Sequence, residues 1–173
     1  MKTNAPKPRG TKNPAPRALC AALLAALLAG PFLGGCGFMG RKDAGEAPPL
    51  AHKVVSTAYS QLGKKYRSGG KSPQTGFDCS GLIWWAYSKN GLTVPRRTVE
   101  QARAGNPVPR DSARPGDILV FRASHAINGL HTGIHAGANS FIHSPRAGAN
   151  VRMESINSPY WSDKLITVRR IVR

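Results

Sequence analysis

The chain has 173 residues, of which 40% are hydrophobic and 19% are charged, with a formal net charge of +17 at pH 7. This length fits one domain and excludes an arrangement of several large domains. The positive charge favours polyanionic surroundings such as cell-wall polymer, acidic lipid or nucleic acid, and a basic surface that serves only solubility is the alternative.

Residues 1–35 have the pattern of an export signal that is removed from the mature protein. Five basic residues precede an apolar run from Ala18 to Leu33, which is too short to span a bilayer comfortably. The run ends in the sequence Leu-Gly-Gly-Cys, which resembles the lipobox of bacterial lipoproteins. This resemblance implies that Cys36 is acylated and becomes the mature N-terminus. An ordinary secretory signal, or a short membrane anchor in which Cys36 is incidental, is the alternative.

Export with a lipid anchor predicts a place in the cell envelope, where nucleic acid is rarely met. Acyl chains on Cys36 would hold the protein to a membrane, and Gly37 is compatible with the periplasmic face of an outer membrane if the organism has one. Residues 36–50 lack an apolar period and are rich in Gly, Ala and Pro, which is typical of a flexible tether. We therefore expect residues 51–173 to form the folded domain.

The cysteines direct attention to one thiol. The chain holds Cys20, which leaves with the signal, Cys36, which is acylated, and Cys79. Cys79 is then unpaired in a compartment where cysteines normally form disulfides. Catalysis is one reason for such a thiol, and a small buried apolar side chain is the other.

Helical spacing of apolar residues marks the first half of the domain. It predicts a helix over His52–Leu62, ended by Gly63, and after a loop over Ser68–Phe77 a second helix over Cys79–Asn90. Asp78 is the expected N-cap of this second helix, and a short helix follows at Val99–Ala104.

Strand patterns separated by turn residues fill the second half. The predicted strands cover Ile118–Arg122, Leu130–Gly137, Ser140–His143, Asn150–Glu154 and Leu165–Val172. Helices followed by a mostly antiparallel sheet of five to six strands define the α+β class.

Cys79 lies where a thiol is readily activated. The first turn of a helix offers unpaired backbone N–H groups and the positive end of the helix dipole, which favour a thiolate and a developing oxyanion. The small residues Ser80 and Gly81 keep the approach to the sulfur open. A nucleophile in this position needs a general base.

The chain has five histidines from which such a base could come. His131 and His135 lie on one predicted strand, about 13 Å apart, so they cannot serve one thiol or one zinc ion together. His143 follows on the next strand and can orient His131, as in a catalytic triad. The chemistry alone scarcely distinguishes His131 from His125 or His135, and His52 lacks supporting context.

Several motifs in order resemble the NlpC/P60 family of cell-wall cysteine peptidases. They are Asp-Cys-Ser-Gly-Leu from residue 78, Pro-Arg from residue 95 with Thr98 and Gln101, Pro-Gly-Asp-Ile-Leu-Val-Phe from residue 115, His-Thr-Gly-Ile from residue 131 and Phe-Ile-His-Ser-Pro from residue 141. The resemblance covers about residues 52–172. Ser68 and His135 depart from residues that are common in the family, which concerns substrate contacts rather than the reaction.

The resemblance implies a papain-like fold with Cys79 as nucleophile, His131 as base and His143 as the orienting residue. Tyr66 matches a family tyrosine before the cysteine, and together with Asp78 and Ser80 it is expected to contact the oxyanion or the substrate. A packed core aromatic is the alternative for Tyr66. No cofactor is expected, and a zinc site among the histidines has no support from paired ligands.

The expected function is hydrolysis of peptidoglycan peptides, at a γ-D-glutamyl-diamino acid bond or a D,D cross-link, through a thioester on the cysteine. A basic cleft lined by residues such as Arg67, Arg96 or Arg97 could bind substrate carboxylates, although a solvated surface position is favoured for any one of them singly. An amidase or acyltransferase with the same triad, and a non-catalytic lipoprotein that binds cell wall, remain as alternatives. A regulatory protein partner is left open.

Overall fold

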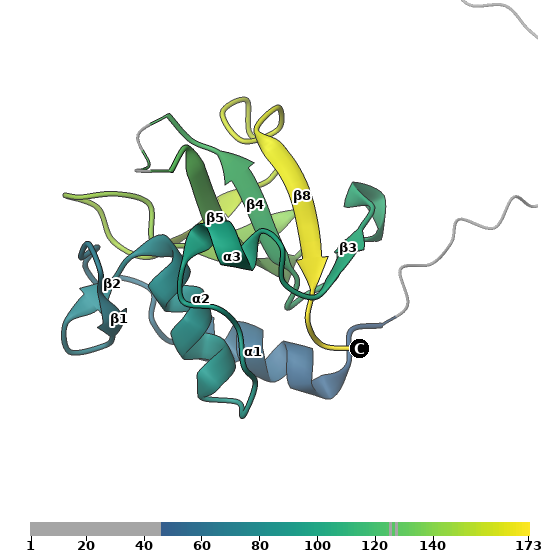
Figure 1. Cartoon of the computed structure of the whole chain (residues 1–173), viewed down its shortest axis with the longest axis horizontal. Coiled ribbons are helices and arrows are strands. Elements are labelled where there is room, and N and C mark those ends of the chain that lie inside the picture. Colours follow the sequence, from purple (N-terminus) through teal and green to yellow (C-terminus); the bar gives the residue numbers. More distant parts are fainter. Residues whose placement is uncertain (1–45, 125, 127) are drawn as a thin grey trace, which may run out of the picture. The chain divides into compact units, whose positions relative to one another are not determined.

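The computed structural model describes residues 46–124, 126 and 128–173, which form an α+β fold (Figure 1). Within these residues three α-helices and a two-stranded hairpin accompany a six-stranded sheet. The strand order is β3-β8-β4-β5-β6-β7, and each neighbouring pair is antiparallel. The predicted class and the antiparallel sheet are therefore confirmed. The predicted signal, Cys36 and the tether up to residue 45 lie outside the described residues.

Helix α1 (Pro49–Tyr59) begins three residues earlier than predicted. Proline fits the first helical position because its missing N–H has no partner there in any case. The helix starts inside the segment predicted as a tether, and Ala47 before it is buried, so the folded part begins before residue 51. No helix among the described residues combines the length and apolar character needed to cross a membrane.

Helix α2 (Cys79–Ser88) starts at the predicted residue and ends two residues earlier than expected. Asp78 is its N-cap, as predicted, and accepts a hydrogen bond from the N–H of Gly81 at 2.6 Å. Helix α3 (Thr98–Gln101) is shorter than predicted and begins one residue earlier.

Three predicted strands have the observed bounds, namely β4 (Ile118–Arg122), β5 (Leu130–Gly137) and β6 (Ser140–His143). The tight turn between β5 and β6 has Ala138 and Asn139 at positive φ. Strand β7 (Arg152–Ser155) is shifted against its prediction, and β8 (Leu165–Arg170) ends two residues early.

Three short strands were missed. Strand β3 (Asn106–Val108) pairs with β8 at an edge of the sheet, where its Pro107 is tolerated but weakens any strand pattern in the sequence. Strands β1 (Lys71–Ser72) and β2 (Gly76–Phe77) form a small hairpin inside the predicted loop. A 3-10 turn, η1 (Arg110–Ser112), also lies outside the predicted elements.

Hydrophobic side chains pack on both faces of the large sheet. The helices cover one face, where Val54, Leu82 and Ile83 pack with sheet residues such as Val120 and Ile134 (Figure 1). A second cluster on the other face consists of Leu119, Phe121, Phe141, Ile156, Trp161 and Val168. Alternation along a strand sends successive side chains to opposite faces, so both clusters draw on the same strands.

Candidate active site

Cys79 is the first residue of α2, and its side chain is half-buried. Its Sγ lies 3.6 Å from Oγ1 of Thr98, the first residue of α3. The sulfur therefore sits at the amino end of a helix, where backbone N–H groups of the first turn lack intrahelical partners. This position suits a thiolate and an oxyanion more than an apolar core residue.

Asp78 and Ser80 flank the cysteine and belong to a closed polar network. Asp78 Oδ2 accepts hydrogen bonds from the backbone N–H of Gly69 at 2.9 Å and from Arg96 Nη2 at 2.8 Å. Its Oδ1 accepts from Arg96 Nη1 at 2.9 Å as well as from the helix. Ser80 Oγ donates to Asp78 Oδ1 at 3.2 Å and accepts from Arg96 Nη1. Both side chains are thus committed to fixing the cysteine's surroundings.

The three arginines expected to receive substrate carboxylates have different places. Arg96 is paired with Asp78 and also donates to the carbonyl of Gly70 at 3.1 Å, so its guanidinium holds the loop before α2. Arg97 is exposed and pairs with Glu100. Arg67 is exposed and is absent from the cleft lining given below, whereas the sequence reasoning missed Arg146, which contributes to it.

The two predicted histidines of the triad come together. His131 on β5 and His143 on β6 are 1% and 0% exposed, and His131 Nε2 lies 2.8 Å from His143 Nδ1. The other histidines are elsewhere: His52 is exposed on α1, and His135 lines a different cavity. His125 lies outside the described residues.

A carboxylate and an indole lie behind the histidine pair, and the sequence reasoning assigned neither to the site. Glu154 on β7 places Oε1 3.5 Å from His143 Nε2, a charge contact longer than an ordinary hydrogen bond. Trp161 donates its indole N–H to Glu154 and stacks on the His131 ring at a centroid distance of 5.4 Å. The contact with His143, then the bonds from Trp161 and Arg152, lower the pKa of Glu154 to about 2 against the effect of burial.

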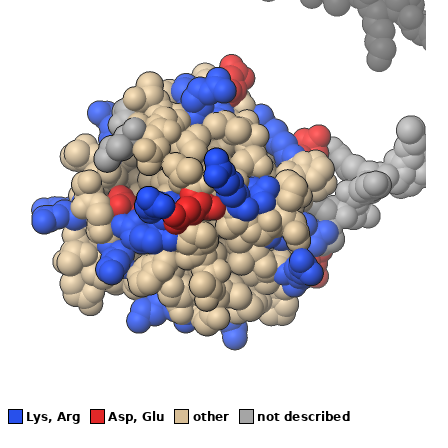
Figure 2. Space-filling model, in the orientation of Figure 1, with Lys and Arg blue, Asp and Glu red and all other residues tan. Residues whose placement is uncertain are grey.

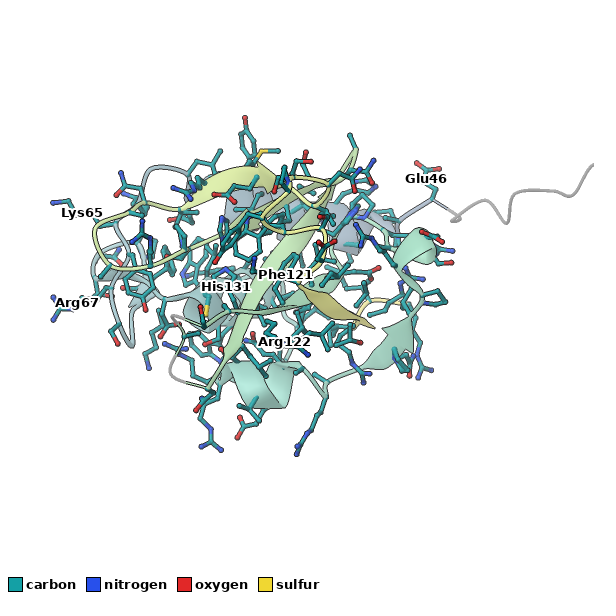
Figure 3. All side chains as sticks on the ribbon, turned by 90° about the horizontal axis from the view of Figure 1, so that it is seen from above. Glu46, Lys65, Arg67, Phe121, Arg122 and His131 are labelled. Atoms are coloured by element: carbon teal, nitrogen blue, oxygen red, sulfur yellow. The ribbon has the colours of Figure 1, made fainter. Side chains whose placement is uncertain are left out.

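The Cys79 thiol and His131 line one cleft of about 720 Å³. The residues before and in the first turn of α2, the start of α3, the start of β5 and the loop after β6 line it: Tyr66, Ser68, Gly69, Asp78, Cys79, Ser80, Arg96, Arg97, Thr98, Ala126, Asn128, Leu130, His131, Pro145, Arg146 and Ala147. In Figure 3 His131 lies between Lys65 and Arg67 on one side and Glu46 on the other. Burial, followed by the negative charges of Cys79 and Asp78, raises the pKa of Tyr66, so its hydroxyl stays protonated as a donor.

Gln101 joins the elements that carry these groups. Its side chain is fully buried and donates from Nε2 to the carbonyls of Ser80 at 3.0 Å and Pro95 at 2.8 Å. Its Oε1 accepts from the hydroxyl of Thr132 at 3.2 Å. One amide therefore fixes the start of α2 against the strand residue next to His131.

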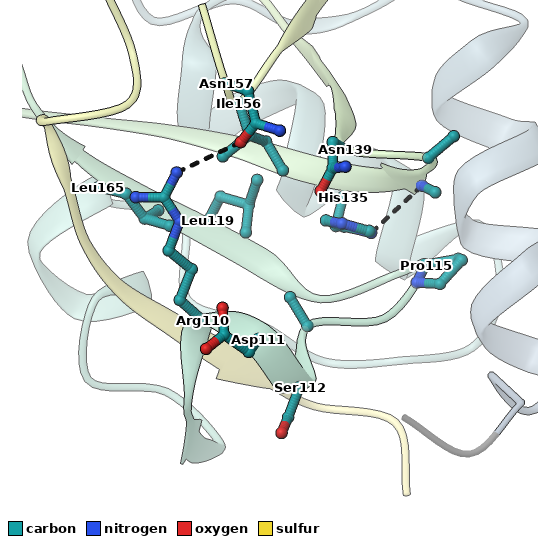
Figure 4. A pocket seen from close by; sticks show the side chains of 13 residues that line it. Arg110, Asp111, Ser112, Pro115, Leu119, His135, Asn139, Ile156, Asn157 and Leu165 are labelled. Atoms are coloured by element: carbon teal, nitrogen blue, oxygen red, sulfur yellow. Dashed lines mark hydrogen bonds between the residues drawn. The ribbon is translucent and has the colours of Figure 1, made fainter. Parts of the chain in front are cut away.

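A second cavity, of about 900 Å³, lies at the other end of β5 (Figure 4). His135 lines it together with Arg110, Asp111 and Asn139, and no cysteine contributes to it. Among the described residues, no three His, Cys, Asp or Glu side chains are placed to hold a metal ion. Of these two cavities, the smaller one is lined by both a thiol and a histidine.

Comparison with known proteins supports the same region of the chain. The model of the NlpC/P60 family matches residues 63–170. Murein DD-endopeptidase MepH of Escherichia coli (strain K12) is 37% identical over 122 residues, covering 69% of this chain and 45% of that protein. The bifunctional muramidase/DL-endopeptidase CwlT of Bacillus subtilis (strain 168) is 34% identical over 119 residues, covering 68% of this chain and 36% of that protein.

A solved structure resembles the fold as well. The crystal structure of an NlpC/P60 family protein from Bacillus cereus superposes with a TM-score of 0.67 at 30% identity, and covers 73% of this chain and 42% of that chain. The chain spans half or less of the length of these three proteins. The similarity thus concerns one shared domain.

Proposed function

Because the chain belongs to the NlpC/P60 family, we propose that it is a peptidoglycan endopeptidase that cleaves peptide bonds through a thioester on Cys79. One observation carries this proposal: Cys79 and His131 line the same cleft, and His131 Nε2 is 2.8 Å from His143 Nδ1. A nucleophile, a base and a group that orients the base are the parts that acyl transfer needs.

The proposed reaction begins with proton transfer from the thiol to His131. Since Nε2 of His131 faces His143, its Nδ1 is the nitrogen assigned to the thiol. The thiolate attacks the substrate carbonyl carbon, and first-turn N–H groups of α2 stabilise the oxyanion. His131 then protonates the leaving amine, and water, deprotonated by His131, hydrolyses the thioester and restores the thiol.

Tyr66 is proposed to donate its hydroxyl to the substrate or to the oxyanion. It lines the cleft, and a phenol hydroxyl, whose pKa burial here raises further above neutral pH, is a hydrogen-bond donor. Asp78 and Ser80 are proposed to act on the reaction through geometry, because their side chains are bonded to Arg96 and to backbone groups.

Peptidoglycan peptides carry carboxylates, and the surface of the domain is basic. Figure 2 shows Lys and Arg side chains spread over the face in view, with few Asp and Glu side chains among them. Arg146 and Arg97 line the cleft, and a guanidinium can bind a carboxylate with two hydrogen bonds. The names of the two relatives include a DD-endopeptidase and a DL-endopeptidase. We propose that the bond cleaved by this chain belongs to one of these two classes.

The test is digestion of purified peptidoglycan by the full chain, compared with Cys79→Ala, with released fragments identified by mass spectrometry. We expect new peptide fragments from the wild type and none above background from the variant, and the fragment masses name the bond. Release of free ammonia, separation of peptide from sugar, or a ligated product would instead favour the amidase or transferase. Intact wall with retained binding to both proteins would favour the non-catalytic lipoprotein.

We further propose that Cys36 carries the lipid that anchors the domain in the cell envelope, on the strength of the Leu-Gly-Gly-Cys sequence after the apolar run. The mature protein isolated from membranes should then begin at Cys36. Its mass should exceed that of the polypeptide by the mass of the acyl chains. Cys36→Ala should release the protein from the membrane fraction, and an unchanged distribution would overturn the anchor.

A further inference from the structure

The histidine pair requires one particular tautomer to work as proposed. If His131 is to present Nδ1 to the thiol, its Nε2 must carry the hydrogen that points to His143. His143 Nδ1 must then accept, which requires the hydrogen of His143 to be on Nε2. A group that attracts a hydrogen at His143 Nε2 would therefore select the productive arrangement of both rings.

Glu154 stands at the position where such a group is needed. Its Oε1 is 3.5 Å from His143 Nε2, on the side of the ring opposite to the nitrogen that meets His131. Strand β6, which carries His143, pairs with β7, and Phe141 lies opposite Glu154. The strand pairing therefore fixes the position of the carboxylate. The carboxylate remains ionised, because its pKa is lowered to about 2.

Trp161 bonds this carboxylate and packs against both histidine rings. Its indole N–H bonds Glu154, its ring lies edge-on to His143 at a centroid distance of 5.3 Å, and it stacks on His131 at 5.4 Å. With 3% of its surface exposed, Trp161 also excludes water from this side of the pair. The Trp161 side chain thus contacts Glu154, His143 and His131.

We propose that Glu154, held by Trp161, is a positioning residue that fixes the Nε2–H tautomer of His143 and stabilises the positive charge that His131 acquires from the thiol. The inference rests on the proposed cysteine chemistry and extends it by one residue beyond the predicted triad. Among the described residues, His131 from β5 and Glu154 from β7 face His143 with titratable groups, and Arg152, opposite His143 in the strand register, pairs with Glu154.

The charge balance gives the direction of the expected effect. A carboxylate that contacts His143 but does not line the cleft with the sulfur favours the thiolate–imidazolium pair over the neutral thiol and imidazole, because it attracts the positive charge on the rings. Glu154→Gln keeps the shape but removes the charge, and its amide can present either an oxygen or an NH₂ group to His143. The fraction of reactive thiolate near neutral pH should fall.

The experiment is alkylation of Cys79 by iodoacetamide on the full chain at pH 6 to 8, read from the peptide that contains Cys79 by mass spectrometry. This reading separates Cys79 from the other cysteines and needs no substrate. Glu154→Gln should slow alkylation about tenfold, which is the lower end of the loss seen when the hydrogen-bond partner of a metal-binding histidine is removed. Glu46→Gln is the matched control, since Glu46 is exposed and lies far from His131 (Figure 3).

A double variant tests whether Glu154 acts on Cys79 through His143. In His143→Asn, which has no second ring nitrogen for the carboxylate to meet, adding Glu154→Gln should change the rate less than about twofold, as expected for residues that act in series. Nitrogen NMR of labelled histidine should show Nε2–H on His143 in the wild type and a mixture of tautomers in Glu154→Gln.

The outcomes separate this inference from the proposed function. A wild-type alkylation rate in Glu154→Gln, or an equal loss in the His143→Asn background, overturns the positioning role even if peptidoglycan is digested. If alkylation slows as expected but the wild type leaves peptidoglycan intact, the positioning role is retained and the proposed substrate is wrong.

Discussion

Strand β5 carries two histidines at its two ends, and each of them lines a cavity. At one end His131 contacts the imidazole of His143 and the indole of Trp161, and it shares its cleft with the Cys79 thiol. Glu154 contacts His143 on the side away from His131. At the other end His135 accepts a hydrogen bond from the backbone N–H of Gly137 at 3.2 Å, and burial lowers its pKa. The cavity at His135 is the larger one, about 900 against 720 Å³.

Neither cavity size nor the presence of a histidine distinguishes the proposed active site. Its neighbouring elements do: α2 places a sulfur at its amino end, β6 places His143 beside His131, and β7 places Glu154 beside His143. Around His135 the neighbours provide a backbone amide and the charge of Asp117, which acts against the effect of burial on the pKa. Burial favours the neutral form of His135, and no cysteine lines its cavity.

The sharpest test of this comparison exchanges each histidine for alanine. His131→Ala should lower the rate of peptide release from peptidoglycan by about 10³-fold, in the range for loss of a general base. His135→Ala should leave the rate within about twofold, because a residue outside the site acts only through stability. Initial rates of fragment release, with circular dichroism as a check of folding, measure both. Similar losses in the two variants would break the comparison.

Asp78 should show that the thiol end of the cleft depends on a polar network. Asp78→Ala removes the N-cap of α2 and leaves Arg96 without its partner, so we expect the free energy of unfolding to fall by about 2 to 4 kcal/mol. Urea denaturation measures the change. Asp111→Ala at the other cavity is the control and should cost less than about 0.5 kcal/mol, since Asp111 is exposed.

Gly133 lies between His131 and His135 on β5, so a side chain at this position should destabilise the strand that carries both histidines. A Cβ at this position would come within 2.5 Å of Phe141 Cδ2, so Gly133→Ala should destabilise the fold by about 1 to 3 kcal/mol through overpacking. Thermal unfolding measures the loss. The loss should be smaller in a Phe141→Leu background, where the ring is gone, and an equal loss there would contradict the clash.

The smallest expected effect is a pH dependence of stability that belongs to His135. Burial lowers the pKa of His135, so the unfolded chain binds a proton near pH 6.5 that the folded chain does not. Stability contributed by the neutral ring is therefore present above pH 6.5 and is lost as the pH falls below it, by less than about 1.4 kcal/mol per pH unit. Melting temperatures from pH 7.5 to 5.5 should fall more in the wild type than in His135→Asn.

The sequence by itself determined the local elements and the family. Apolar spacing and an Asp at the N-cap placed Cys79 at the start of α2, and alternation between turn residues gave the bounds of β4, β5 and β6. These signals come from residues within a few positions of one another, so they can be read along the chain. The motifs predicted the NlpC/P60 family, and the family model confirms it.

The tertiary structure decided which of these residues meet. Arg96 lies 18 residues from Asp78 in the chain, and nothing local indicates that its guanidinium is used there rather than for substrate. Glu154 and Trp161 join the histidines because β7 pairs with β6 and because Trp161 packs in the second hydrophobic cluster. Contacts of this kind depend on strand order and side-chain packing across the sheet, which sequence periodicity does not encode.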